Sequence, residues 1–161
     1  MLLKQKIDAI KYLKTTKKNF DLILIKQTIH FFSKKKIQKL IRLIKLRLKK
    51  KGLIYIMTLD TKNNEIPCFS IMKKALEKSL KKDKENILFI RKHFKKIIEK
   101  KFIFKVKIKK KIYIKMLKNR YISCLLRMPK NEIDKGIYEI SKKYYNQIIF
   151  RDRLICLIYK N

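Results

Sequence analysis

The chain has 161 residues, of which 47% are hydrophobic, and its 46 Lys and Arg against 12 Asp and Glu give a formal net charge of +34. This length predicts a single domain over residues 1–161, and the hydrophobic content excludes the apolar-poor composition of an intrinsically disordered chain. The charge favours polyanionic partners, but only seven of the basic residues are Arg, the type that recognises phosphate best. We therefore attribute most of the Lys excess to an A/T-rich coding sequence and expect non-specific nucleic-acid binding from it.

Cysteine and glycine usage excludes several kinds of site. Cys68, Cys124 and Cys156 form no C-x-x-C pair, which argues against a zinc site or a disulfide framework and favours an intracellular, cytoplasmic location. No apolar run approaches the ~18 residues of a membrane span, so no membrane partner is expected. The two glycines, Gly52 and Gly136, cannot form a G-x-G-x-x-G loop or a P-loop.

The first half of the chain predicts a strand, a helix and a second strand. Phe20–Ile25 reads FDLILI, an apolar run typical of a parallel strand buried on both faces. Lys49–Lys51 are expected in the last turn of the following helix, with Gly52 as its left-handed cap. Leu53–Thr58, LIYIMT, predicts a second buried strand parallel to the first. The apolar stripe of the helix between the strands follows helical spacing: Ile37, Leu40, Ile41, Ile44 and Leu48.

Further elements follow in chain order. Asp60–Pro67 is rich in turn-forming residues and predicts a loop. Phe102–Ile108 alternates apolar residues with Lys over its second half and predicts a strand with one solvated face. Helices are predicted over Tyr113–Cys124 and Ile133–Tyr144, and a last strand over Arg153–Tyr159. Between the loop and Phe102, two separate helical patterns are predicted: Met72, Ala75, Leu76 and Leu80, then Ile87, Ile90, Phe94, Ile97 and Ile98.

The segment FDLILIKQTIHFF, the basic helix after it and LKKKGLIYIMT together resemble the fourth strand, next helix and fifth strand of class I S-adenosylmethionine-dependent methyltransferases. In that family FD opens the strand, a His often follows it, and L-K-x-G-G precedes the next strand; here Lys51 occupies one glycine position. RYISCLL, NEIDKGIYEI and IIFRDRLICLIYK resemble the closing helices and final strand of some small-molecule methyltransferases. The resemblance implies an α/β fold, an incomplete Rossmann-like sheet with parallel central strands, a C-terminal antiparallel strand and helices on both faces. It corresponds to the C-terminal half of the family, without the first strands and the glycine-rich loop.

The resemblance also implies S-adenosylmethionine as cofactor and methyl transfer to a small-molecule acceptor. Asp8 and Ala9 correspond to a short motif that places a carboxylate near the adenine amine, and Gln27 is assigned to the same cofactor. His30 and Lys26 follow the carboxyl end of a predicted strand, where active-site groups collect, and are the candidates for removing a proton from the acceptor. The competing interpretations are an exposed surface carboxylate for Asp8 and a partly buried structural histidine for His30.

Other assignments stay open at this stage. Asp60 and Thr61 are candidates to line the same crevice, or form a surface turn; Tyr121 belongs to a substrate lid, or to a helix facing the core. Whether this chain alone is an enzyme is undecided, because the resemblance places the glycine-rich loop in a missing N-terminal half. One alternative is a non-enzymatic protein that binds RNA or ribosomes through Lys-coated helices. Another is a chain that completes its sheet by pairing with a partner polypeptide.

Overall fold

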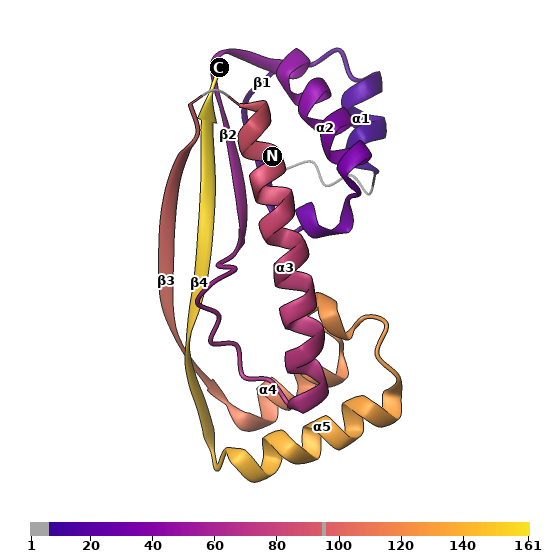
Figure 1. The fold of residues 1–161 in the computed structure, drawn as a ribbon, viewed down its shortest axis with the longest axis vertical. Helices are drawn as coiled ribbons and strands as arrows, with labels where there is room; N and C mark the ends of the chain where they lie inside the picture. The colour runs from indigo at the N-terminus through magenta and orange to yellow at the C-terminus, as the bar shows by residue number, and fades with distance from the viewer. Residues whose placement is uncertain (1–6, 95) are drawn as a thin grey trace. The chain divides into compact units, whose positions relative to one another are not determined.

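The computed structural model describes residues 7–94 and 96–161 (Figure 1). Within these ranges the strands are β1 (Phe20–Lys26), β2 (Leu48–Leu59), β3 (Ile98–Lys109) and β4 (Gln147–Lys160). The α-helices are α1 (Ala9–Thr15), α2 (Lys34–Arg47), α3 (Ser70–His93), α4 (Lys110–Lys118) and α5 (Lys130–Lys143). Two single turns of 3-10 helix complete the elements: η1 (Ile29–Phe31) and η2 (Ser123–Leu125). The predicted α/β class is confirmed.

The four strands form one mixed sheet in the order β1-β2-β4-β3. β1 and β2 are parallel, with Ile23 opposite Ile54. Backbone hydrogen bonds join Asn161 to Gly52 and Asp60 to Arg153. Because the partner number falls as the residue number rises, β4 runs antiparallel to β2. The parallel pair joined by α2, and the antiparallel C-terminal strand, are therefore confirmed as a partial Rossmann-like sheet.

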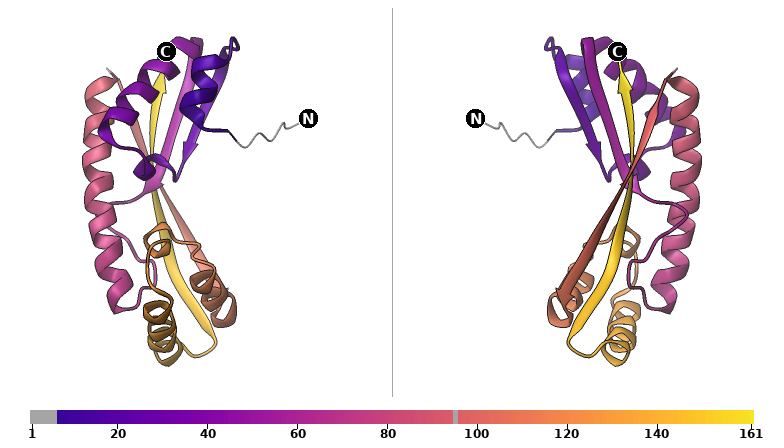
Figure 2. Two further views of the ribbon diagram at one scale, coloured as in Figure 1. Left: turned by 90° about the vertical axis from the view of Figure 1, so that its right-hand side faces the viewer. Right: turned by 90° about the vertical axis from the view of Figure 1, so that its left-hand side faces the viewer.

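The described residues divide into two compact units. Unit 1 contains the residues up to Thr58 together with Glu85–Lys100 and Ile155–Asn161, and unit 2 contains Leu59–Lys84 and Lys101–Leu154. In unit 1, α1 packs beside α2 (Figure 2). The core of unit 1 includes Ile29, Ile37, Ile44, Ile54, Ile90 and Leu157. The core of unit 2 includes Phe69, Met72, Tyr113, Leu117, Leu125 and Ile140.

Helix α2 buries the stripe that its spacing predicts, since Ile37, Ile41 and Ile44 are all buried. Its first turn is capped by Ser33, whose Oγ accepts a hydrogen bond from the backbone N–H of Lys36 at 3.4 Å. The predicted end of the helix is wrong. The helix ends at Arg47, and Lys49–Lys51 and Gly52 already belong to β2.

The left-handed backbone that was expected at Gly52 occurs one residue earlier. Lys51 has φ of 67°, whereas neither glycine has positive φ. Gly52 is needed for a different reason: a Cβ atom there would lie 2.9 Å from Leu48 Cγ and from the Lys49 carbonyl oxygen. The left-handed position is also the one at which the family pattern has a glycine and this chain has a lysine.

Replacing Lys51 with glycine is expected to raise the free energy of unfolding by about 0.5–1 kcal/mol. A left-handed backbone costs an L-residue roughly 1–2 kcal/mol, and the extra freedom of glycine in the unfolded chain offsets part of that gain. Urea denaturation of K51G measures the effect. K50G is the matched control because Lys50 has no positive φ; it should lose stability, and equal losses in both variants would contradict the left-handed assignment.

The two helical patterns predicted after the loop form one continuous helix, α3. No glycine or proline interrupts the chain between Ser70 and His93, so the backbone hydrogen bonds run through. Ile97 and Ile98 lie outside this helix, and Ile98 begins β3. The start of α3 is held from α5: the Glu139 carboxylate accepts hydrogen bonds from the backbone N–H and the hydroxyl of Ser70, at 2.9 and 2.7 Å.

Three other predictions need correction. β1 is the outer strand of the described sheet, and Leu22 and Leu24 are 51% and 54% exposed, so it is not buried on both faces. In β3 the predicted alternation is present from Lys105 to Ile108, where exposed lysines alternate with half-buried apolar residues, but the strand before Lys105 is exposed on both faces. The helix predicted through Cys124 ends at Lys118, because Arg120 adopts φ of 53° and turns the chain.

Candidate functional site

The carboxyl end of β1 is a tight turn in unit 1. Lys26 lies opposite Met57 in the parallel register, and the backbone N–H of Gln27 donates to the Met57 carbonyl at 2.7 Å. Gln27 itself has φ of 50°, a left-handed conformation that is uncommon for residues other than glycine and concentrates at functional turns. The side chains of Lys26 and Gln27 are both exposed directly beyond the strand.

The turn continues into η1, which fixes His30. Ile29 is buried in the core of unit 1 and anchors this short helix. The His30 side chain is half-buried and packs on the exposed Phe31, with ring centroids 4.2 Å apart and planes inclined by 52°. Imidazole side chains commonly serve as general acids or bases in enzymes. Lys26, Gln27 and His30 therefore follow one another along a single turn.

Asp8 and Ala9 stand at the start of α1. The Asp8 carboxylate caps this helix, with Oδ1 accepting a hydrogen bond from the Lys11 backbone N–H at 2.9 Å. Both residues are exposed. The cap gives Asp8 a structural role, and its assignment to the cofactor stays a prediction.

An apolar groove of about 300 Å³ runs along β1. Ala9 and Thr28 line it, together with Leu22 and Leu24 of β1 and Leu40 of α2. Of the predicted site residues, Ala9 alone lines this groove, and Asp8, Lys26, Gln27 and His30 do not. The structure thus brings the end of β1 and the start of α1 to one region of unit 1.

Asp60 and Thr61 lie in unit 2. Asp60 is buried, and its Oδ1 accepts hydrogen bonds from the backbone N–H groups of Lys62 and Asn63 at 2.8 and 3.4 Å. A carboxylate that bonds the backbone two and three residues ahead shapes a turn. Of the two roles considered for Asp60, lining a crevice or forming a turn, these hydrogen bonds support the turn.

Tyr121 is exposed, beside a segment that Arg120 holds in place. The Arg120 Nη1 atom donates to the carbonyl oxygens of Leu125, Leu126 and Met128, at 2.6, 3.1 and 2.6 Å. One guanidinium thus fixes the loop after α4. This arrangement leaves the ring of Tyr121 outside the core, and the lid assignment stays a prediction.

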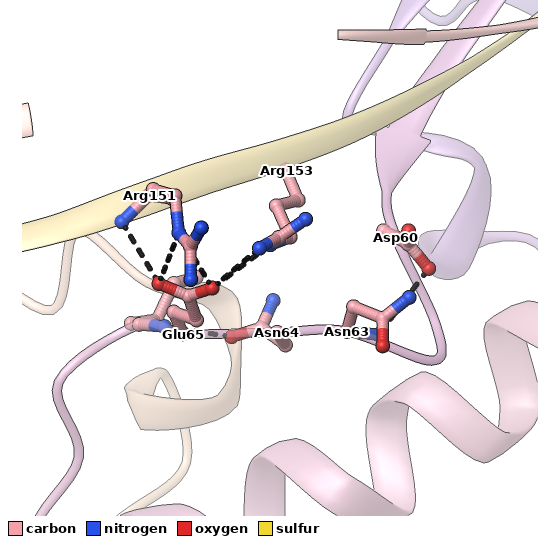
Figure 3. A network of polar contacts seen from close by, with 7 residues as sticks. Asp60, Asn63, Asn64, Glu65, Arg151 and Arg153 are labelled. Atoms are coloured by element: carbon pink, nitrogen blue, oxygen red, sulfur yellow. Dashed lines mark hydrogen bonds and ion pairs between the residues drawn. The ribbon is translucent and has the colours of Figure 1, made fainter. Parts of the chain in front are cut away.

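A polar network that the sequence did not reveal joins the loop after β2 to β4, within unit 2 (Figure 3). The Glu65 carboxylate accepts hydrogen bonds from Arg151 Nε at 3.0 Å and from Arg153 Nη2 at 2.7 Å. The backbone N–H of Arg151 also donates to it, at 3.3 Å. The bonds from Arg151, and then those from Arg153, lower the pKa of Glu65 to about 2. Glu65 and Arg151 are 86 residues apart in the sequence, so no local sequence pattern could have predicted their pairing.

Substituting Glu65 with glutamine should remove a pH dependence of stability at acid pH. The folded pKa of about 2 lies below the ordinary value of 4.5, so the ionised carboxylate stabilises the fold above pH 4.5. This contribution is lost as the pH falls through about 2. Urea unfolding at a series of pH values from about 6 down to 2 should show that the difference in the free energy of unfolding between wild type and E65Q becomes smaller. E77Q makes the same chemical change at an exposed position of α3, and a gap in E65Q that stays constant with pH would contradict the network.

The cysteines do not form a reactive centre. Burial raises the pKa of the Cys68 thiol to about 12 and that of the Cys124 thiol to about 11, so both are protonated and weakly nucleophilic near neutral pH. Among residues 7–94 and 96–161 there is no group of three His, Cys, Asp or Glu side chains placed to hold a metal ion. None of the helices in this described part is both long and apolar enough to cross a membrane.

Comparisons with known proteins give structural neighbours only. No family model matches the sequence, and no match is found among curated proteins. A SAM-dependent methyltransferase from Archaeoglobus fulgidus is 17% identical with a TM-score of 0.47, over 98% of this chain and 66% of its own. Precorrin 8W decarboxylase from Methanobacterium thermoautotrophicum is 13% identical with a TM-score of 0.44, over 96% and 52%. Phosphoethanolamine N-methyltransferase 2 from Haemonchus contortus, solved with S-adenosylhomocysteine, is 15% identical with a TM-score of 0.43, over 96% and 36%.

The chain thus spans between about a third and two thirds of the length of these three proteins. At such identities the case for a function rests on this chain's own strand order, register and side chains. Those features are the parallel β1–β2 pair and the polar turn from Lys26 to His30 that follows it.

Proposed function

We propose that this chain is a methyltransferase-like protein that forms one wall of an S-adenosylmethionine site and serves methyl transfer to a small-molecule acceptor. One observation carries the proposal: a polar turn with a left-handed Gln27 stands directly beyond the carboxyl end of β1, in a parallel pair. In open α/β sheets, ligands bind in the crevice outside the carboxyl ends of the strands. The sequence motifs that resemble class I methyltransferases lie on the same elements.

The described residues fit one side of such a cofactor. Gln27 offers an exposed amide, and Ala9 lies in an apolar groove beside Asp8, whose carboxylate is at the surface. The bound cofactor would supply an electrophilic methyl group. The protein's part is to hold the acceptor in line with that group and to take up the acceptor's proton. The His30 imidazole or the Lys26 amine would accept it.

The proposal includes a polypeptide that covers β1, either a partner chain or an N-terminal half. β1 is an outer strand in the described sheet, and Leu22 and Leu24 are exposed on it. An uncovered apolar edge strand is a template for pairing with another strand. The groove of about 300 Å³ beside β1 offers an apolar seat for such a segment. A further strand at this edge would bring its own carboxyl-end loop next to Gln27.

The free thiols support an intracellular location. Cys68, Cys124 and Cys156 are all free, which suits a reducing environment. The proposal therefore places the chain inside the cell, in the cytoplasm.

Calorimetry of the purified chain with S-adenosylmethionine and S-adenosylhomocysteine, combined with a methyl-transfer assay in cell extract supplemented with the chain, tests the proposal. We expect saturable heat with at least one ligand, or methyl transfer that depends on the added chain. H30Q or K26Q should abolish the transfer, whereas H93Q, which alters the other histidine at the end of α3, should not. If the chain gives no binding heat with either ligand and no chain-dependent methyl transfer, the proposal is refuted.

A further inference from the structure

The strand β3 is the second outer strand of the described sheet, with β4 on one side of it and no strand on the other (Figure 1). Its part in unit 2 comprises residues 101–109. In the part of the chain that the structure describes, no loop or turn makes a backbone hydrogen bond to these residues. Every second N–H and C=O group of the segment is therefore open to another strand, and proteins add strands from a partner at such edges.

The side chains of this segment divide between two faces. Phe102 and Phe104 share one face, because residues two apart on a strand point the same way. Their side chains are 37% and 50% exposed, and their rings are inclined by 9° with centroids 6.4 Å apart. The opposite face carries three exposed lysines: Lys101, Lys105 and Lys107. An apolar patch and a basic row thus stand back to back along one strand.

The basic row has no compensating negative charge. No acidic residue occurs between Lys101 and Lys109, and the ion pairs found within residues 7–94 and 96–161 involve none of the three lysines. Glu65 lines a groove beside Lys105, but its carboxylate is already bonded to Arg151. Like charges in a row repel one another, and carboxylates directly opposite them on a neighbouring strand would offset this cost.

We propose that residues 101–109 bind an extended acidic segment of another protein, which adds a strand to the edge of the sheet. The backbone of this segment pairs with the open edge of β3. Its carboxylates lie beside Lys105 and Lys107, and its apolar side chains, at alternate positions, cover Phe102 and Phe104. This binding is independent of the proposed methyl-transfer site and stands or fails separately.

The two faces of the strand favour this occupant over two others. An RNA strand would meet the lysines on one face and leave the rings on the other, whereas an added strand presents side chains to both faces. A second copy of β3, paired with its apolar face on the same side, would place lysine beside lysine. Each copy also carries a net charge of +34, which opposes self-association.

Fluorescence anisotropy with a labelled peptide of about nine residues, in which glutamate alternates with valine, tests the proposal. A peptide of the same composition with its glutamates in one block is the control for charge. We expect the alternating peptide to bind at least about tenfold more tightly, because only the alternating order forms cross-strand pairs on both faces. Equal affinity for the two peptides would overturn the proposal.

Two N-methylated forms of the alternating peptide test the backbone pairing. Successive N–H groups of a strand point to opposite sides, so methyl groups on one set of alternate residues block the bonds to β3, and those on the other set do not. We expect one form to lose at least about tenfold in affinity and the other to bind nearly as the parent does. Equal affinities of the two forms would exclude strand addition.

Two charge-matched variants separate the basic row from the overall charge. K105E/K107E and K73E/K74E change the net charge equally, and all four lysines are exposed in unit 2. K105E/K107E should lose at least about tenfold more affinity for the alternating peptide than K73E/K74E does. Circular dichroism should find both variants folded, since the changed side chains are at the surface. Equal losses would show non-specific attraction and overturn the proposal.

The variant F102T/F104T tests the other face at unchanged charge, because threonine suits a strand but lacks the ring. It should bind the alternating peptide about tenfold more weakly and the block peptide as wild type does. Unchanged affinity for the alternating peptide would contradict the proposal. An oligouridylate of about 12 nucleotides that loses as much affinity in F102T/F104T would assign the segment to RNA. Self-association that disappears in this variant would assign it to a second copy, and either result would overturn the proposal.

Discussion

Replacing Gly136 with alanine is expected to lower the free energy of unfolding by about 2 kcal/mol, the cost of forcing an extra methyl group into a packed core. A Cβ atom at this position in α5 would lie 2.3 Å from Cγ and Cδ2 of Phe69. Phe69 is only 2% exposed, so its ring has little room to move. Helix propensity alone predicts the opposite sign, a gain of about 1 kcal/mol for alanine over glycine. Chemical denaturation of G136A therefore decides between packing and propensity.

A double-mutant cycle provides the control. In F69L/G136A the smaller side chain leaves space for the new methyl group, so the double variant should be more stable than the sum of the two single effects implies. Additive losses, or a G136A variant at least as stable as wild type, would contradict the close packing of α5 on Phe69.

Asp83→Asn is expected to stabilise the fold by about 2 kcal/mol at pH 8 and to change it little near pH 4. Asp83 is 3% exposed in α3, and its Oδ1 has no hydrogen-bond partner among the described residues. Burial raises the pKa of Asp83 from 3.8 to about 6. Below pH 3.8 the carboxyl is neutral in both states and costs nothing. As the pH rises from 3.8 to about 6, the carboxyl ionises in the unfolded chain while burial keeps it protonated in the fold. Wild-type stability therefore declines until the pH has passed about 6.

Urea unfolding of wild type and D83N across pH 4 to pH 8 measures this difference. D134N is the matched control, since Asp134 is an exposed aspartate on α5, and surface substitutions of this kind change stability by less than about 0.5 kcal/mol. A stability gap that is as large at pH 4 as at pH 8 would rule out ionisation of Asp83 as its cause.

Elements whose signals are local could be predicted from the sequence. The stripe of Ile37, Ile41 and Ile44 identifies α2, and the apolar runs on either side identify β1 and β2. Because strand–helix–strand units favour parallel pairing, the relation of the two strands follows as well. These features depend on neighbours a few residues apart.

Features set by distant residues could not be predicted. The exposure of Leu22 depends on which strand lies at the edge of the sheet, and the network of Glu65 with Arg151 joins two segments that carry no matching motif. The helix that was expected to reach Gly52 ends earlier, at Arg47.

The sequence predicted where the candidate site residues lie, but it does not determine what each of them does. Lys26, Gln27 and His30 do follow the carboxyl end of a parallel strand, as the order of elements requires. The helix-capping bond of Asp8 depends on where α1 begins. The sequence around Asp8 predicts a carboxylate there but does not distinguish a cap from a ligand contact.

Backbone amide NMR of the chain titrated with S-adenosylhomocysteine tests the proposed cofactor site, because it locates the ligand residue by residue. We expect saturable shift changes confined to the turn after β1, from Gln27 to Phe31, and to the start of α1 at Asp8 and Ala9. We expect none at Phe102 and Phe104 in β3. Saturation at any other surface, with the turn after β1 unperturbed, would contradict the proposed site.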